Sequence, residues 1–156
     1  MKLIFKQRMF SWFDSYDIFD EYGNVAFRVK GQLSWGHMFK IYNAMGDEVG
    51  CVKQKILTFL PRFEIYSRDN YVGCITKEFS FFKPKFSIDY NGWQVEGNLF
   101  EFDYFISDSF GNNVAKVEKQ FFNWTDTYEI NVYNDSNALS ALMLVIAIDA
   151  EKCSRD

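Results

Sequence analysis

Apolar and polar residues alternate along most of the chain with the two-residue period of a β-strand. In the segment VAFRVK, apolar side chains at Val25, Phe27 and Val29 alternate with Ala26, Arg28 and Lys30. This alternation predicts a strand with one buried and one solvent-facing side. Runs of the same kind recur as far as Ile130, so the pattern predicts a chain built mainly of short strands.

A repeated pair of phrases gives the number of strands. The first phrase joins a charged or amide pair to an aromatic residue and ends at Trp12, Trp35, Phe59, Phe81, Phe102 and Trp124. The second is a strand that ends in Ile, around Ile18, Ile41, Ile65, Ile88, Ile106 and Ile130. Six units of two strands each predict twelve strands.

Turn-forming residues separate the two strands of each unit. Tyr22-Gly23-Asn24, Gly46-Asp47 and Ser109–Asn112 are typical of hairpin connections. Asn91-Gly92 predicts the tightest hairpin, because this pair accepts positive φ at little cost. Twelve short antiparallel strands in an open sheet would leave exposed edges, and we therefore expect the sheet to close on itself.

The C-terminal segment differs in character. Residues 138–150 read ALSALMLVIAIDA, which favours a helix that is apolar on every side, with Asp135 or Ser136 as the N-cap. Thirteen residues are too few to span a bilayer. The predicted fold is mainly β: a closed antiparallel twelve-stranded β-barrel with a central C-terminal hydrophobic α-helix over about 136–150, in a single domain over 1–156.

Several of these segments resemble one known family. KQKILTFLPRFEIY, KEFSFFKPKFSI, GWQVEG and LSALMLVIAIDA look like the bacterial branch of the LURP-one-related family. That family is similar in fold to the Tubby C-terminal domain and to phospholipid scramblases. The resemblance covers about Lys2 to Asp149 and implies a twelve-stranded barrel around a central helix. It also implies membrane-linked roles, although no segment matches the Tubby basic cluster or the scramblase calcium segment.

Composition and charge limit the function classes. Aromatic residues make up 20% of the chain, which favours pleated, half-buried positions. A net charge of −4 argues against a nucleic-acid partner. The three cysteines lack CxxC spacing and the first residues lack a signal peptide, so we expect free thiols, with Cys51 and Cys74 buried, in a cytoplasmic protein.

No pattern predicts a catalytic site, a metal site or a cofactor. His37 is the only histidine, and Asp14, Asp17, Asp20 and Glu21 fit no calcium loop, so turn or strand-end roles are expected for all of them. Asp149 lies near the end of the apolar helix. Its carboxylate must reach solvent, a cation or hydrogen-bond donors, which favours an anchor at the barrel mouth over a ligand-facing acid.

The strongest candidate for function is a basic segment. Residues 49–90 carry seven Lys or Arg against four Asp or Glu, within an acidic chain. The candidate ligands for an anionic head group are Lys53, Lys55, Arg62, Lys83 and Lys85, which are interleaved with aromatic residues. The leading hypothesis is a non-catalytic module that binds anionic phospholipid or a membrane surface, peripheral at the inner face. The alternative for these cations is that they only solvate the strand ends. The second hypothesis for the protein is then a protein-interaction or structural barrel with no small-molecule ligand, and the third is an uncharacterised enzyme.

Overall fold

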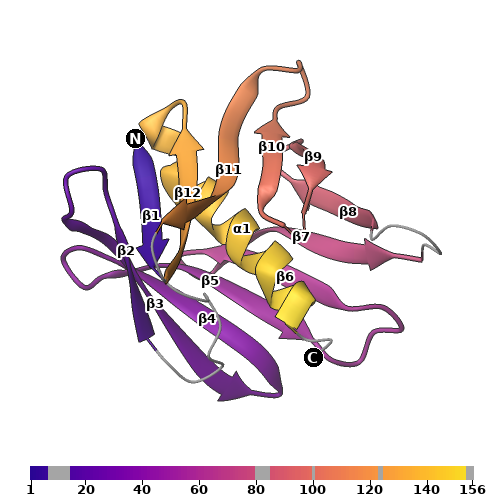
Figure 1. Ribbon diagram of the computed structural model, residues 1–156. Helices are drawn as coiled ribbons and strands as arrows, with labels where there is room; N and C mark the ends of the chain where they lie inside the picture. The colour runs from indigo at the N-terminus through magenta and orange to yellow at the C-terminus, as the bar shows by residue number, and fades with distance from the viewer. Residues whose placement is uncertain (7–14, 80–84, 100, 123–124, 154–156) are drawn as a thin grey trace.

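The computed structural model describes residues 1–6, 15–79, 85–99, 101–122 and 125–153 (Figure 1). Within these ranges the chain forms twelve β-strands, a short 3-10 helix and one α-helix. The strands are β1 (Lys2–Lys6), β2 (Ser15–Phe19), β3 (Val25–Ser34), β4 (Gly36–Asn43), β5 (Glu48–Lys55), β6 (Arg62–Ser67), β7 (Asn70–Glu78), β8 (Lys85–Tyr90), β9 (Gln94–Asn98), β10 (Asp103–Ser107), β11 (Asn113–Phe122) and β12 (Thr125–Val132). The helices are η1 (Asp135–Asn137) and α1 (Ala138–Cys153).

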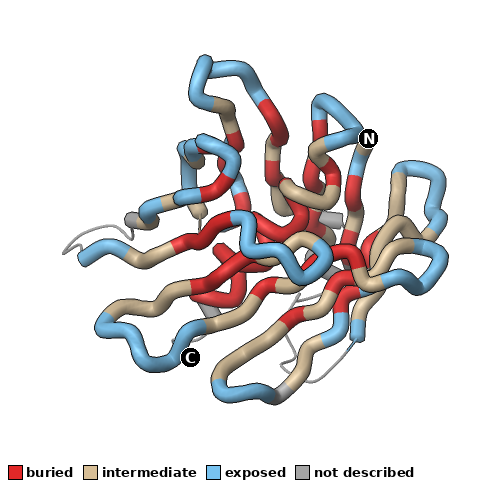
Figure 2. Tube along the Cα trace, turned by 180° about the vertical axis from the view of Figure 1, so that it is seen from behind, coloured by how far each residue is buried: buried red, intermediate tan, exposed pale blue. Residues whose placement is uncertain are grey.

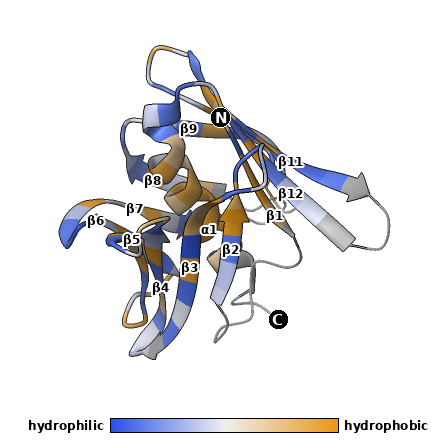
Figure 3. Ribbon diagram, turned by 90° about the vertical axis from the view of Figure 1, so that its left-hand side faces the viewer, coloured by the Kyte–Doolittle hydropathy of each residue, from blue (hydrophilic) through white to orange (hydrophobic). Residues whose placement is uncertain are grey.

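All twelve strands belong to one antiparallel sheet, which confirms the predicted strand number. The order is β8-β7-β6-β5-β4-β3-β2-β1-β12-β11-β10-β9, so most strands pair with their neighbours in sequence. The exception is β1, which joins the two halves of the chain by pairing with β12, with Leu3 opposite Ile130. The sheet curls around α1 (Figures 1 and 3).

The barrel is nearly closed, and the prediction of full closure was wrong at one seam. The chain turns at Asn91-Gly92, where both residues have positive φ and the Trp93 amide donates to the Tyr90 carbonyl at 3.0 Å, but the hairpin predicted there was wrong, because the two strands that the turn joins do not pair. Beyond that turn, however, β8 pairs only with β7 and β9 only with β10. The local turn signal does not fix closure, because the register of each edge strand is set by its other neighbour.

Helix α1 fills the space that the sheet encloses. Every residue from Ala141 to Ala150 is buried, which matches the all-round apolar sequence (Figure 2). The prediction placed this helix at the centre of the barrel. In the structure it is not strictly central and packs mainly against β5, β6, β7 and β12. A Cβ atom at Gly50 would lie 2.6 Å from Sδ of Met143, so β5 approaches the helix closely there.

The start of the helical region differs from the prediction by one or two residues. Asn134, rather than Asp135 or Ser136, provides the cap: its Oδ1 accepts from the Ser136 amide at 3.1 Å. One 3-10 turn then precedes α1. Asp135 instead forms an ion pair with the amino group of Met1 at 3.1 Å. Within the described residues, no helix is both long and apolar enough to cross a membrane.

The two ends of the barrel differ in chemistry. We call "turn end" the end formed by the turns 20–24, 43–47 and 108–112. Each turn is closed by its first residue (Asp20, Asn43 or Asp108), whose side-chain oxygen accepts amide hydrogen bonds from within the turn. The hairpins predicted at these three turns are therefore confirmed, since the strands on either side of each turn pair with each other. We call "aromatic end" the opposite end, with the described connections at Trp35, 56–61 and Phe79.

Candidate functional site

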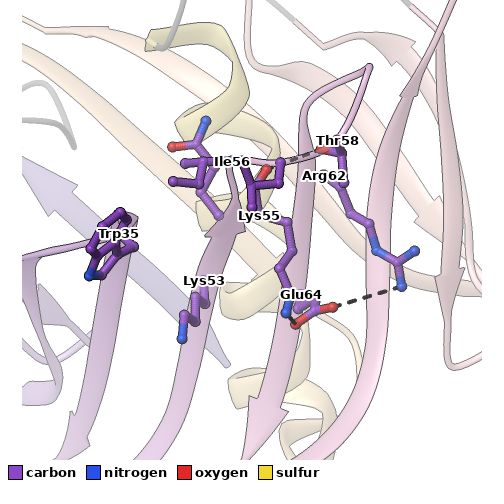
Figure 4. A pocket seen from close by; sticks show the side chains of 9 residues that line it. Trp35, Lys53, Lys55, Ile56, Thr58, Arg62 and Glu64 are labelled. Atoms are coloured by element: carbon purple, nitrogen blue, oxygen red, sulfur yellow. Dashed lines mark hydrogen bonds and ion pairs between the residues drawn. The ribbon is translucent and has the colours of Figure 1, made fainter.

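A pocket of about 480 Å³ opens at the aromatic end, between the β3–β4 and β5–β6 connections. Its lining residues are Trp35, Lys53, Gln54, Lys55, Ile56, Leu57, Thr58, Arg62 and Glu64 (Figure 4). The pairing of β5 with β6 places Lys53 opposite Glu64 and Lys55 opposite Arg62. Residues two apart on a strand share a face, so these four polar side chains lie on one side of the sheet. We call this site the rim pocket.

Gly36 sets how closely the two connections approach each other. Its φ of 106° lies in the left-handed region, and it follows Trp35 at the tip of the β3–β4 hairpin. A Cβ atom at this position would lie 2.7 Å from Cγ2 of Ile56 and 2.9 Å from the Gln54 carbonyl oxygen. Only glycine therefore allows the tip to pack on β5 and brings Trp35 to the side of the pocket.

The β5–β6 connection exposes large apolar side chains. Leu57 and Phe59 are each 96% exposed, and Trp35 beside them is 87% exposed. The Thr58 hydroxyl contacts the carbonyl oxygens of Lys55 and Leu60 at 3.1 and 2.7 Å, which holds the connection in a compact turn. The aromatic end thus presents apolar side chains next to the cations of the rim pocket.

Glu64 is the electrostatic centre of the pocket. Its Oε2 lies 3.4 Å from Nζ of Lys55, and its Oε1 lies 3.9 Å from Nη2 of Arg62. The Tyr66 hydroxyl donates to Oε2 at 2.6 Å, and this hydrogen bond raises the pKa of Tyr66 to about 12. Glu64 is 9% exposed, because these longer side chains cover it. Two of the cations of the pocket are thus paired within the protein.

Of the five predicted ligand residues, the structure brings three together. Lys53, Lys55 and Arg62 all line the rim pocket. Lys85 begins β8, which is separated from β6 by β7, and its Cα partner is Glu78. Lys83 lies outside the described residues. Lys53 forms no ion pair with any residue that the structure describes, so it is the cation most available to a ligand.

The other candidate residues have structural roles. Asp17 forms an ion pair with Arg28 at 2.6 Å, and Asp20 closes its turn, while Asp14 lies outside the described residues. The His37 amide donates to the Gln54 side chain, and burial lowers the pKa of its imidazole. In the described part of the chain, no cluster of three His, Cys, Asp or Glu residues suits a metal ion.

Both described cysteines are free thiols. Cys74 is buried, as expected, whereas Cys51 is only half-buried. Desolvation nevertheless raises the pKa of Cys51 to about 11. A thiol with so high a pKa carries little thiolate at neutral pH and is a poor nucleophile.

Acidic groups near the end of α1 face the barrel interior. Glu151, 1% exposed, lies 3.4 Å from Nζ of Lys77 on β7. Asp149, 5% exposed, lies near the buried Tyr104, and burial together with the charge of Asp149 raises the pKa of that hydroxyl well above its usual value. The strand side chains therefore provide polar neighbours for the end of the helix, and the Asp149 carboxylate is buried rather than exposed to solvent.

Sequence reasoning missed two residues that shape the rim pocket. Trp35 was only a repeat marker, although its place between Ser34 and Gly36 predicts an exposed hairpin tip. Glu64 was counted only as a charge. The sequence could have indicated its role, because Glu64 stands two positions after Arg62 and therefore lies on the same face of the strand.

The comparisons with known proteins agree on one family. The sequence profile described as LURP-one-related matches residues 1–149. The chain is also 30% identical over 151 residues to "Uncharacterized protein YxjI" of Bacillus subtilis (strain 168). The aligned region covers 96% of this chain and 92% of that protein. No solved structure matches the chain.

Proposed function

The chain belongs to the LURP-one-related family, and we propose that this member is a non-catalytic module that binds an anionic membrane surface with its aromatic end. The observation that carries the proposal is the exposure of Trp35, Leu57 and Phe59 beside the cations of the rim pocket. Membrane-surface binding gains from buried apolar area and from attraction between cations and anionic lipid, and this end offers both. The resemblance to Tubby domains and scramblases supports the same role.

Charge favours the aromatic end over the turn end. The turn end also exposes large apolar side chains, at Tyr22, Met45 and Phe110. They stand among the acidic residues Asp20, Glu21, Asp47 and Asp108, which an anionic membrane would repel. Exposed apolar side chains alone therefore do not distinguish the two ends as membrane-binding surfaces. Their combination with the cations Lys53, Lys55 and Arg62 favours the aromatic end.

A non-catalytic role is supported by the lining of the rim pocket. Its one carboxylate, Glu64, is held by two cations and the Tyr66 hydroxyl, and its one hydroxyl, of Thr58, contacts main-chain carbonyl oxygens. Glu64 serves as the ion-pair partner of Lys55 and Arg62, and the Thr58 hydroxyl faces carbonyl oxygens and not a base, so the pocket does not present the paired nucleophile and base of covalent catalysis.

The test of the proposal is co-sedimentation with vesicles of neutral or anionic lipid over a salt series. We expect binding that requires anionic lipid and weakens as salt rises, because salt screens the attraction. Absence of binding to anionic vesicles at low salt would refute the proposal and favour a protein-interaction role, for which the turn end is the candidate surface.

The apolar contribution has its own prediction. Changing Trp35, Leu57 and Phe59 together to Ser should weaken binding to anionic vesicles at least about tenfold, because each side chain loses its transfer from water into the lipid interface. The melting temperature should hardly change, since all three side chains are exposed. The matched control changes Tyr22, Met45 and Phe110 to Ser at the turn end. Equal vesicle binding by the two triple variants would contradict the assignment of the aromatic end.

A further inference from the structure

We infer that the rim pocket accepts one phosphate monoester group and that Glu64 is the residue that sets its affinity. The inference rests on the proposed function for its place at a membrane. The chemistry of the pocket is the same for a lipid head group and for a soluble phosphate monoester. Glu64 is then an internal counter-ion that competes with the ligand for the cations of the site.

The charges of the pocket fit a dianion. Lys53, Lys55 and Arg62 contribute three positive charges, and Glu64 contributes one negative charge. The remaining excess of two positive charges matches a phosphate monoester, which carries about −1.5 to −2 at neutral pH. A volume of about 480 Å³ is within the range of small-molecule sites.

The position of Glu64 makes it a competitor. It lies on the same face of the sheet as the three cations and within 4 Å of two of them. Charged side chains that contact one carboxylate are less available to a second anion, because the ligand must replace an interaction that already exists. Arg62 keeps one donor for a ligand: no group of the described chain accepts a hydrogen bond from its buried Nε, whereas its Nη2 donates to the Tyr71 hydroxyl at 3.4 Å and lies 3.9 Å from Oε1 of Glu64.

The structure also explains why Glu64 stays in place. The hydroxyl of Tyr66 holds Oε2 from the neighbouring position on the same face of β6, and Lys55 approaches that oxygen from β5. A glutamine at position 64 would keep its length and an oxygen for Tyr66, while the negative charge is lost and an NH2 group replaces the second oxygen. The substitution Glu64→Gln therefore isolates the electrostatic competition from the shape of the site.

The experiment measures wild-type protein and Glu64→Gln in two assays. The first is calorimetric titration with glycerol 3-phosphate, and the second is sedimentation with phosphatidylcholine vesicles that carry phosphatidic acid or, at equal total charge, phosphatidylserine. The matched control is Glu48→Gln, at the other end of β5, which changes the net charge equally. It removes the ion-pair partner of Lys40, whose Nζ lies 2.8 Å from Oε2 of Glu48. We expect Glu64→Gln, but not Glu48→Gln, to bind glycerol 3-phosphate about fivefold more tightly or better.

The two assays separate the inference from the proposed function. Tighter binding of glycerol 3-phosphate by Glu64→Gln, with no vesicle binding by any protein, would support the inference for a soluble ligand and overturn the membrane proposal. Equal binding of glycerol 3-phosphate by wild type, Glu64→Gln and Glu48→Gln, with binding of all three proteins to anionic vesicles, would overturn the inference and leave the membrane proposal standing. Binding of neither ligand by any protein would overturn both.

A second variant keeps the inference testable if Glu64→Gln does not fold. Lys53 has no ion pair within the described chain, so Lys53→Gln removes a ligand contact without leaving a partner behind. It should weaken binding of glycerol 3-phosphate about fivefold and leave the melting temperature unchanged. Unchanged binding by Lys53→Gln would overturn the inference.

Discussion

Replacing Leu142 with Asp should prevent the chain from folding. Leu142 is fully buried in the second turn of α1, with Ala141 and Met143 also buried beside it. An ionised carboxylate in this apolar interior has no cation within the helix turn around it, and an unpaired buried charge costs several kcal/mol. The total stability of a domain of this size is about 5–15 kcal/mol. The variant should be insoluble, or soluble without a cooperative thermal transition.

The control for this prediction is the same substitution at an exposed leucine. Leu57 is 96% exposed, so Leu57→Asp should keep the wild-type melting temperature to within a few degrees. Circular dichroism melting of both variants is the measurement. A Leu142→Asp variant that melts cooperatively near the wild-type temperature would show that this face of α1 is not buried in the sheet.

Removal of residues 138–156 should produce an aggregating chain. Without α1, the inner faces of β5, β6 and β7 lose the helix that covers Val52, Ile65 and Ile75, each of which is at most 1% exposed in the full chain. An apolar surface of this extent drives association in water. Size-exclusion chromatography and near-UV circular dichroism are the measurements, with the full chain as the reference. A monomeric truncated chain with a native-like spectrum would mean that the sheet has a sufficient core of its own.

The strand number was predictable because it depends on local patterns that repeat. The alternation around Val29 and the turn residues around Gly23 together specify one hairpin. Each repeat of this local pattern adds another hairpin, and no long-range information is needed to count them. Closure was not predictable, because the seam lies next to the best local turn signal in the chain. Tyr90 and Trp93 flank that turn and are both buried, with rings 5.6 Å apart. Whether pairing continues beyond them depends on the twist accumulated over all the other strands.

The candidate site was predictable as composition but not as geometry. The prediction gave five candidate ligand residues, Lys53, Lys55, Arg62, Lys83 and Lys85, and the structure brings the first three together in one pocket. It did not predict that Glu64 pairs with two of them. That pairing depends on the register of β5 against β6, which places Lys55 opposite Arg62 and Lys53 opposite Glu64. Register is set by packing of the buried face, here Val52 and Ile65, and not by the charged face.

This pairing changes how the basic site has to be tested. Removing Lys55 and Arg62 together would leave the carboxylate of Glu64 largely buried without its cations. Removing one partner of a buried ion pair leaves the other charge without compensation, and this destabilises the fold. A loss of vesicle binding in such a variant would therefore mix stability with affinity, whereas Lys53→Gln and Glu64→Gln do not.

The most direct test of the account is to determine which end of the barrel meets the membrane. A nitroxide label is attached at Leu57→Cys or, separately, at Met45→Cys, each in a Cys153→Ser background. Burial of Cys74 and the pKa of about 11 at Cys51 make these thiols slow to react at neutral pH. Electron paramagnetic resonance then compares the accessibility of each label to oxygen and to a water-soluble nickel complex, with and without anionic vesicles. The account predicts that the label at position 57 moves into lipid while the label at position 45 stays in water; a label at 57 that remains in water, or insertion of the label at 45, would contradict it.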